Sequence, residues 1–174
     1  MGATAPVTLV LGGARSGKSR YAESLVAGAP PPWIYIATAE AFDDEISQRI
    51  AEHKARRDRR WQTVEAPRNI VDALVDVPPS ASILVDCVTL WLSNLLLAEV
   101  DIEQEMKRLD AALAQSRRAT VLVANEVGCG IVPDNALARR FLDLQGRLNQ
   151  QLAVRADRVV LMVAGLPLFV KGQP

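Results

Sequence analysis

The sequence predicts an α/β fold in which a mostly parallel sheet is flanked by helices. Five short apolar runs alternate with longer segments of helical periodicity, an order typical of parallel strands joined by crossover helices. The runs are apolar at nearly every position, as strands are when helices cover both faces of their sheet. No repeat, low-complexity tract or linker interrupts this order, so we expect residues 1–174 to form a single domain.

The expected strands are runs rich in apolar and β-branched residues. They span Val7–Leu11, Trp33–Ala37, Ser82–Val85, Thr120–Ala124 and Arg158–Val163. We expect the residues after the last run, which end in Lys171 and Pro174, to form a short tail.

Helical periodicity separates these strands. The expected helices span about Gly17–Ala27, Asn69–Val75, Val88–Leu97, Ile102–Arg118 and Asn135–Ala156. Between residues 42 and 60 the chain is polar, with Ile46 and Ile50 spaced as on one helix face. The Val88–Leu97 segment is apolar nearly all round, which predicts either a central helix or one that packs against another subunit.

The composition is that of an ordinary soluble globular protein, with 49% hydrophobic and 23% charged residues. Twenty basic residues offset twenty acidic ones, and this balance argues against a protein that coats nucleic acid. Two cysteines are too few for a disulfide framework, and they lack the spacing of a zinc site. We expect the thiols of Cys87 and Cys129 to be buried and inert.

No segment of the sequence predicts stable membrane insertion. The most apolar stretch, Ile83–Val100, contains Asp86, Ser93, Asn94 and Glu99, and a strand followed by a buried helix explains it. The first six residues carry no basic n-region of a signal peptide. We therefore expect a cytoplasmic protein.

A complete phosphate-binding motif follows the first predicted strand. The segment GGARSGKS fits G-x-x-x-x-G-K-[ST], with a strand before it and a helix after it. Its glycines permit a tight turn that aims N–H groups at phosphate oxygens, and the new helix adds its positive end. The residues expected to bind a nucleotide here are Gly12, Gly13, Ala14, Arg15, Ser16, Gly17, Lys18 and Ser19. The sequence thus predicts a P-loop NTPase-type, RecA-like fold that uses a nucleoside triphosphate for phosphoryl or nucleotidyl transfer.

Three residues are candidates for contact with the outer phosphates and with Mg²⁺. Lys18 would reach the outer phosphates as a catalytic residue, and the Ser19 hydroxyl would hold Mg²⁺. Asp86 ends the third predicted strand, where a second metal-binding carboxylate is expected. A cap for the helix that begins at Val88 is the other interpretation of Asp86.

The only histidine lies among arginines on a predicted helix face. Arg49, His53, Arg56 and Arg57 fall at positions i, i+4, i+7 and i+8. Nearby positive charge disfavours protonation and keeps an imidazole neutral and nucleophilic near pH 7. The pattern fits a nucleophile that attacks a nucleotide phosphorus, although from these residues alone a solvated basic helix with an incidental histidine is the simpler interpretation.

Two later segments have open interpretations. Asn125–Pro133 follows the fourth strand with two glycines, where α/β proteins bind ligands, but a plain connecting loop fits as well. Arg139, Arg140 and Arg147 on the next helix are placed to meet a substrate phosphate, yet such residues more often form a solvated face.

Several segments match one family together. They are Leu11–Ser19 (LGGARSGKS), Tyr35–Thr38 (YIAT), Arg49–His53 with Trp61 and Glu65, Val85–Leu96 (VDCVTLWLSNLL), Asn125–Asp134 (NEVGCGIVPD) and Ala138–Gln150. From Val7 to Lys171 the sequence resembles the bifunctional adenosylcobinamide kinase/adenosylcobinamide-phosphate guanylyltransferases of cobalamin biosynthesis, the CobU/CobP family. The resemblance also implies a homo-oligomer, a trimer in this family, and the all-apolar Val88–Leu97 helix suits one.

The resemblance implies two reactions on corrinoid substrates. A kinase step passes the γ-phosphoryl group of ATP or GTP to adenosylcobinamide. In a guanylyl step a histidine, matched here by His53, attacks the α-phosphorus of GTP and releases pyrophosphate. Adenosylcobinamide phosphate then takes the guanylyl group to give adenosylcobinamide-GDP.

The resemblance extends the expected nucleotide site, which would hold GTP or ATP with Mg²⁺, beyond the phosphate loop. The added residues are Thr38, Ala39, Glu40, Lys54, Arg56, Arg57, Glu65 and Asp86. Two positions depart from the family pattern. Many members have proline where this chain has Asp58, which affects the end of the histidine helix, and some have Glu where it has Asp86.

Two other function classes stay open at this point. One is a small-metabolite kinase without a covalent step, which radioactive labelling from the α-phosphate of GTP would separate. The other is a nucleotide-driven switch protein, although the guanine-reading motif N-K-x-D is absent after the fourth strand.

Overall fold

The computed structural model describes residues 5–40, 51, 55 and 57–173. The strands are β1 (Val7–Gly12), β2 (Trp33–Ala37), β3 (Trp61–Glu65), β4 (Ser82–Asp86), β5 (Thr120–Asn125), β6 (Arg158–Val163) and β7 (Leu166–Lys171). The helices are α1 (Lys18–Ala27), α3 (Ile70–Asp76), α4 (Val88–Leu97), α5 (Ile102–Gln115) and α6 (Ala136–Arg155). The polar segment predicted between residues 42 and 60 lies largely outside the described residues.

The strands form one seven-stranded sheet in the order β3-β2-β4-β5-β1-β6-β7. Neighbouring strands are parallel from β3 to β6, and only β7 runs antiparallel to its neighbour. The phosphate-loop strand β1 lies between β5 and β6, so β5 separates it from β4, which ends in Asp86. The predicted fold class, a mostly parallel P-loop sheet of RecA-like arrangement, is confirmed.

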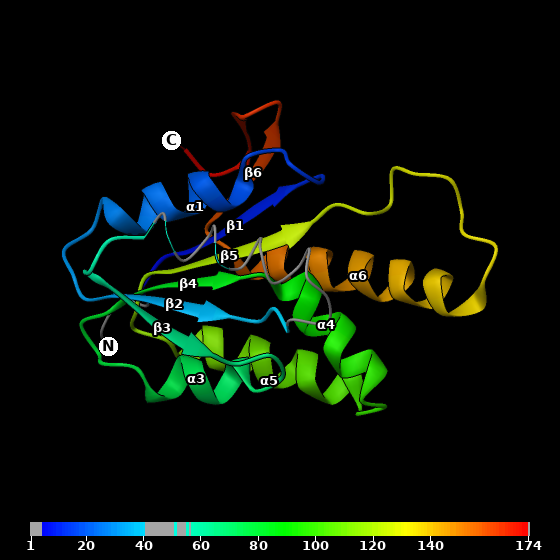
Figure 1. The fold of residues 1–174 in the computed structure, drawn as a ribbon, viewed down its shortest axis with the longest axis horizontal. Coiled ribbons are helices and arrows are strands. Elements are labelled where there is room, and N and C mark those ends of the chain that lie inside the picture. Colours follow the sequence, from blue (N-terminus) through cyan, green and yellow to red (C-terminus); the bar gives the residue numbers. More distant parts are fainter. Residues whose placement is uncertain (1–4, 41–50, 52–54, 56, 174) are drawn as a thin grey trace.

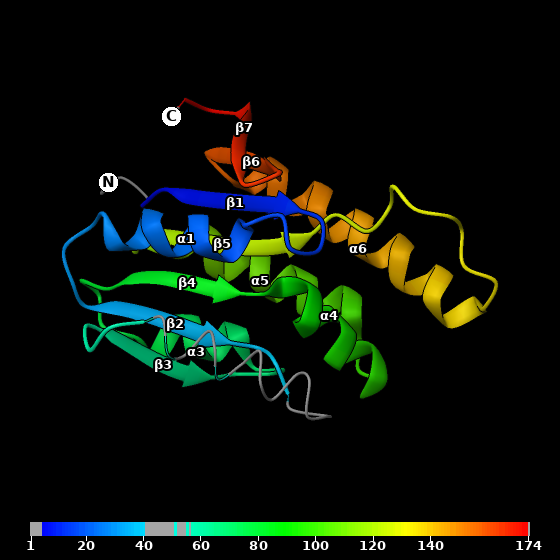
Figure 2. The same cartoon turned by 45° about the horizontal axis from the view of Figure 1, so that its top comes forward.

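Helices cover both faces of the sheet (Figures 1 and 2). On one face, α3, α4, α5 and α6 pack against strand side chains such as Leu9 and Ile36. On the other face, α1 packs against the alternate side chains, among them Val10 and Tyr35. This two-sided burial explains why the central strands are apolar at nearly every position.

Two edge strands were not predicted. β3 is mostly exposed and polar, because its residues form the outermost strand and lack the apolar run that marks a central strand. The expected C-terminal tail is wrong, because Leu166–Lys171 forms β7, the other edge. Ala164 and Gly165, both with positive φ, make the two-residue turn from β6 into β7.

One predicted helix agrees with the structure, and another ends earlier than predicted. α4 is a largely central helix whose side chains are mostly buried, with Leu90 and Leu97 as its exposed large apolar residues. The predicted Ile102–Arg118 helix ends at Gln115, because Ser116 is extended and its hydroxyl accepts a hydrogen bond from the Arg118 N–H. Among the described residues, no helix has the length and apolarity needed to cross a membrane.

Candidate nucleotide-binding site

The phosphate loop connects the carboxyl end of β1 to the first turn of α1. Gly17 caps α1 with φ of +93°, a left-handed conformation that favours glycine. A Cβ on Gly12 would overlap the Ser16 side chain and lie 3.0 Å from the Met162 carbonyl oxygen. Glycine is therefore required at both positions by the turn itself, with or without a ligand.

Contacts within the loop hold its shape. The Lys18 ammonium donates a 2.8 Å hydrogen bond to the Gly13 carbonyl, so its side chain folds back over the loop. The Gly165 N–H, in the turn between β6 and β7, donates to the Ser16 carbonyl at 3.0 Å. The buried Ser16 hydroxyl has no hydrogen-bond partner in the described part of the chain. A phosphate oxygen is a suitable acceptor for such a hydroxyl.

The strand register brings several predicted site residues to the carboxyl ends of neighbouring strands. Gly12 is in register with Asn125, and Ala37 is in register with both Glu65 and Asp86. Glu126 donates its N–H to the Gly12 carbonyl at 3.1 Å, which joins the end of β5 to the phosphate loop. Because one strand separates β1 from β4, these two strands lie about 10 Å apart across the sheet, and Asp86 lies two residues before the level of Gly12.

Asp86 does not cap the following helix. Cys87 occupies the N-cap position of α4, and no side chain makes a capping hydrogen bond there. Asp86 is half-buried, and its Oδ2 accepts a 3.0 Å hydrogen bond from the Tyr35 hydroxyl. The capping interpretation is therefore wrong, and the carboxylate points toward the α1 side of the sheet, where Tyr35 lies.

The two cysteines differ, and the expectation that both are buried is wrong for Cys129, which is exposed. Cys87 is buried, and this burial, with the negative charge of Asp86, raises the pKa of its thiol to about 12. The positive charge of Lys18 acts in the opposite direction on the Cys87 pKa, so its ammonium lies within electrostatic reach of the end of β4. The phosphate loop and Asp86 therefore share one electrostatic environment.

Arg57 stacks on the face of Tyr35. Its guanidinium carbon lies 3.5 Å from the ring centroid, a cation–π contact. Its buried Nη1 has no hydrogen-bond partner among the described residues. Burial, followed by the charge of Asp86, raises the pKa of the Tyr35 phenol, which is therefore a hydrogen-bond donor at neutral pH. An arginine N–H left unpaired in this place is suited to an anionic ligand.

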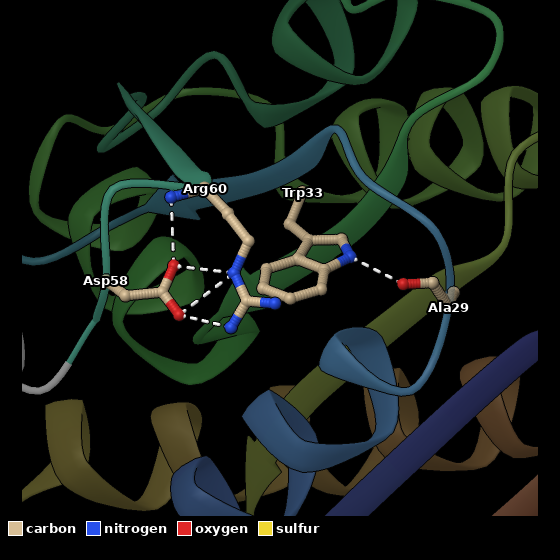
Figure 3. A network of polar contacts seen from close by, with 4 residues as sticks. All are labelled: Ala29, Trp33, Asp58 and Arg60. Atoms are coloured by element: carbon tan, nitrogen blue, oxygen red, sulfur yellow. Dashed lines mark hydrogen bonds and ion pairs between the residues drawn. The ribbon is translucent and has the colours of Figure 1, made fainter.

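The Trp33 side chain supports the segment that follows Arg57 (Figure 3). Arg60 lies over the Trp33 ring, 4.3 Å from its centroid, and the Trp33 indole N–H donates to the Ala29 carbonyl. Asp58 accepts hydrogen bonds from the backbone and the guanidinium of Arg60, which hold the pKa of this exposed carboxyl below its usual range. Asp58 and Arg60 thus form a local ion pair in a non-helical stretch.

The remaining predicted contacts are placed as follows. Thr38 is fully buried, and its hydroxyl bonds both the N–H and the carbonyl of Cys87. Ala39 and Glu40 follow it and are half-buried, while Glu65 ends the edge strand β3. His53, Lys54 and Arg56 lie outside the described residues. Their roles stay predictions, as does nucleotide contact by Thr38, Ala39, Glu40 and Glu65.

The loop after β5 projects from the body of the protein in both views (Figures 1 and 2). The Arg139 guanidinium at its far end donates to the carbonyls of Pro133 and Asp134, and Arg147 pairs with Glu103. In this structure, Arg139 bonds the loop that precedes α6, and Arg147 forms an exposed ion pair between α6 and α5.

The oxygen atoms at the carboxyl ends of the strands suit Mg²⁺ as ligands. The Ser19 hydroxyl and the Asp86 carboxylate are oxygen ligands of the kind Mg²⁺ prefers. Within the described ranges, no group of three or more His, Cys, Asp or Glu side chains could hold a metal ion alone. A magnesium ion that uses one carboxylate, a hydroxyl and nucleotide phosphates needs no such group.

Tyr35 is the site residue that sequence reasoning missed. It lies within the matched YIAT segment, but its contacts with Asp86 and Arg57 depend on strand pairing and on the fold of a later segment. The available signal was a polar-tipped aromatic in a strand otherwise made of apolar residues.

Known proteins resemble the chain over almost its full length. The sequence profile described as cobinamide kinase / cobinamide phosphate guanyltransferase matches residues 8–170. The chain is 46% identical to the bifunctional adenosylcobalamin biosynthesis protein CobP of Pseudomonas aeruginosa, covering 95% of this chain and 98% of that protein. It is 44% identical to the bifunctional adenosylcobalamin biosynthesis protein CobU of Salmonella typhimurium, covering 94% and 98%.

Two solved structures share the fold at low sequence identity. A Pyrococcus horikoshii OT3 protein superimposes with a TM-score of 0.58 at 9% identity, covering 97% of this chain and 87% of that one. The RadB recombinase superimposes with a TM-score of 0.53 at 17% identity, covering 92% and 76%. These likenesses support the P-loop architecture alone, whereas the sequence matches are specific, and the chain belongs to the cobinamide kinase / cobinamide phosphate guanyltransferase family.

Proposed function

We propose that this protein phosphorylates adenosylcobinamide with ATP or GTP and then transfers GMP from GTP to the product. The final product is adenosylcobinamide-GDP, and the second step passes through a guanylyl-histidine on His53. Membership of a family named for both activities supports the pair of reactions. The observation that carries the proposal is the intact phosphate loop between β1 and α1, with glycine at the two positions that the turn requires and the Lys18 side chain folded over the loop.

In the kinase step, the hydroxyl of the aminopropanol arm of adenosylcobinamide attacks the γ-phosphorus. The bond to the oxygen that bridges the β- and γ-phosphates breaks, the nucleoside diphosphate leaves, and the hydroxyl proton is released. Loop N–H groups and Lys18, once it leaves the Gly13 carbonyl, stabilise the charge on the transferring group. Ser19 and Asp86 would hold Mg²⁺, which supplies further charge stabilisation.

In the guanylyl step, a ring nitrogen of His53 attacks the α-phosphorus of GTP, and the bond to the oxygen that bridges the α- and β-phosphates breaks. Pyrophosphate leaves, and a phosphate oxygen of adenosylcobinamide phosphate then attacks the α-phosphorus and breaks the P–N bond. An imidazole suits this sequence because it is a good nucleophile and, once protonated, a good leaving group. We assign Arg57, with its unpaired Nη1, to a phosphate of the bound GTP.

The setting proposed for these reactions follows the family. We propose a cytoplasmic protein, homo-oligomeric and trimeric as the resemblance implies, that binds neither nucleic acid nor membrane stably. The seven-stranded sheet that takes in strands from Val7 to Lys171 supports a single P-loop domain over residues 1–174. GTP, ATP and Mg²⁺ are its proposed ligands, with Thr38, Ala39, Glu40, Lys54, Arg56, Glu65 and Asp86 as further site residues.

Product analysis tests this proposal directly. The purified protein is incubated with adenosylcobinamide, ATP, GTP and Mg²⁺, and the corrinoids are identified by mass spectrometry. We expect adenosylcobinamide phosphate to appear first and adenosylcobinamide-GDP after it. Accumulation of the phosphate alone would reduce the protein to a kinase, and nucleotide binding without either product would favour a switch protein.

A further inference from the structure

Tyr35 and Asp86 form a specific pair at the carboxyl edge of the sheet. Tyr35 is in register with Leu84 on the neighbouring strand, so Asp86 is its diagonal neighbour on the same face. The phenol hydroxyl donates to Oδ2 of Asp86 at 3.0 Å. The two side chains therefore meet next to the position where the phosphate loop and Asp86 would hold a nucleotide.

The Tyr35 ring has a fixed orientation. It is 5% exposed, the Arg57 guanidinium lies 3.5 Å from its centroid, and the Trp61 ring meets it edge-on at 6.2 Å and 77°. A ring held between two such neighbours directs its hydroxyl along one line. The Asp86 carboxylate, which is only half-buried, takes its orientation from that hydroxyl.

A carboxylate that binds a metal is usually oriented by a hydrogen bond to its other oxygen. The bond from Tyr35 occupies Oδ2 of Asp86 and leaves Oδ1 for a metal. We propose that Tyr35 is a positioning residue that orients Asp86 toward the Mg²⁺ of the bound nucleotide. This inference rests on the proposed metal role of Asp86, while Tyr35 itself touches neither metal nor nucleotide.

The variant Tyr35→Phe removes only the hydroxyl and keeps the ring contacts with Arg57 and Trp61. Two affinities are measured on the folded protein. The first is the affinity for Mn²⁺ in the presence of a saturating non-hydrolysable GTP analogue, measured by electron paramagnetic resonance. The second is the affinity for the same analogue when EDTA removes the metal. We expect Mn²⁺ to bind about 10- to 100-fold more weakly, with the affinity for the analogue in EDTA unchanged and the stability reduced only by the loss of one hydrogen bond. The matched control is Tyr21→Phe, at the other tyrosine of the chain, which should change neither affinity.

The variants Asp86→Asn and Tyr35→Phe/Asp86→Asn separate this inference from the function it rests on. If Tyr35 acts through the carboxylate, Tyr35→Phe weakens Mn²⁺ binding in the native background and adds nothing to Asp86→Asn. Unchanged Mn²⁺ affinity in Tyr35→Phe with a loss in Asp86→Asn overturns the role of Tyr35 and leaves the proposed metal site standing. An equal loss in both backgrounds, or parallel losses of the affinities for Mn²⁺ and for the analogue in EDTA, would show a structural role and overturn it as well. Unchanged Mn²⁺ binding in Asp86→Asn removes the metal assignment and this inference together.

Discussion

The Thr38 hydroxyl makes two hydrogen bonds of 2.8 Å to the backbone of Cys87, donating to its carbonyl and accepting from its N–H. This pair ties the end of β2 to the junction between β4 and α4. Asn94 of α4 completes the connection, because its amide donates to the Thr38 carbonyl at 2.9 Å. The strand end that carries Asp86 is therefore fixed by buried polar contacts.

Replacing Thr38 tests how strongly this junction depends on them. Thr38→Val keeps the shape but leaves the buried N–H of Cys87 without its partner, whereas the Cys87 carbonyl keeps the N–H of Trp91, so we expect a stability loss of about 1–3 kcal/mol. The measurement is urea denaturation followed by circular dichroism. Thr38→Ser keeps the hydroxyl and should lose clearly less, and equal losses in the two variants would contradict the hydrogen-bond explanation.

Gly12 should tolerate no side chain. Gly12→Ala places a Cβ against the Ser16 side chain and the Met162 carbonyl, so the loop must shift. We expect at least about a tenfold loss of GTP affinity, because misplaced N–H groups no longer meet the phosphates. Isothermal titration of GTP with Mg²⁺ measures this change, and wild-type affinity in Gly12→Ala would contradict the loop geometry.

Gly146 of α6 provides the contrasting substitution. A Cβ there meets nothing within 4 Å, and alanine is a better helix former than glycine. We expect Gly146→Ala to raise the free energy of unfolding by about 0.5–1 kcal/mol and to leave GTP affinity unchanged. A destabilised protein by urea denaturation would show that this helix face is covered, for example by another subunit.

The central part of the fold could be predicted from the sequence because strands that are buried on both faces appear as continuous apolar runs. The runs at Val7–Leu11 and Ser82–Val85 are apolar at almost every position, and the structure places both between other strands. The edge strands are harder to recognise. β3 reads WQTVE, and β7 carries Pro167, which edge strands accept because they leave N–H groups unpaired.

The site could be predicted only in part for a similar reason. Local motifs such as Gly12–Ser19 can be recognised from the sequence, because the residues that bind the ligand are consecutive. The hydrogen bond from Tyr35 to Asp86 joins residues 51 positions apart. It depends on the pairing of β2 with β4, which the sequence of neither segment predicts. His53, the residue of the covalent step, lies outside the described residues, so its role stays a prediction.

The two thiols should differ sharply in reactivity. Cys129 is exposed, whereas Cys87 is buried with a thiol pKa raised to about 12, and the thiolate is the reactive form. We expect a maleimide to modify Cys129 in the folded protein and Cys87 only after unfolding in urea. Peptide mass mapping identifies the modified residue, and rapid modification of Cys87 under native conditions would contradict its burial.

The ion pair between Asp110 and Arg155 links α5 to α6 and predicts a pH effect. The hydrogen bond from Arg155, at 2.8 Å, holds the pKa of Asp110 below its usual value. The carboxylate therefore stabilises the fold above the ordinary aspartate pKa and loses this effect as pH falls through the lowered one. Because the pair is partly exposed, we expect Asp110→Asn to cost about 0.5 kcal/mol near neutral pH.

Urea denaturation of the wild type and Asp110→Asn at several pH values checks this expectation. The difference between their free energies of unfolding should vanish in strong acid, where the native carboxyl is protonated as well. A difference that stays constant across the whole range would mean that packing, and not charge, explains the effect of the substitution.

Covalent labelling tests the proposed guanylyl-histidine most directly. The protein is incubated with Mg²⁺ and GTP carrying a radioactive α-phosphate, then denatured and separated from free nucleotide. We expect label that is stable in base and labile in acid, as a phosphoramidate is, and no label on His53→Ala. Stable labelling of His53→Ala, or a wild type that takes up no label while it still produces adenosylcobinamide-GDP, would contradict a covalent step on this histidine.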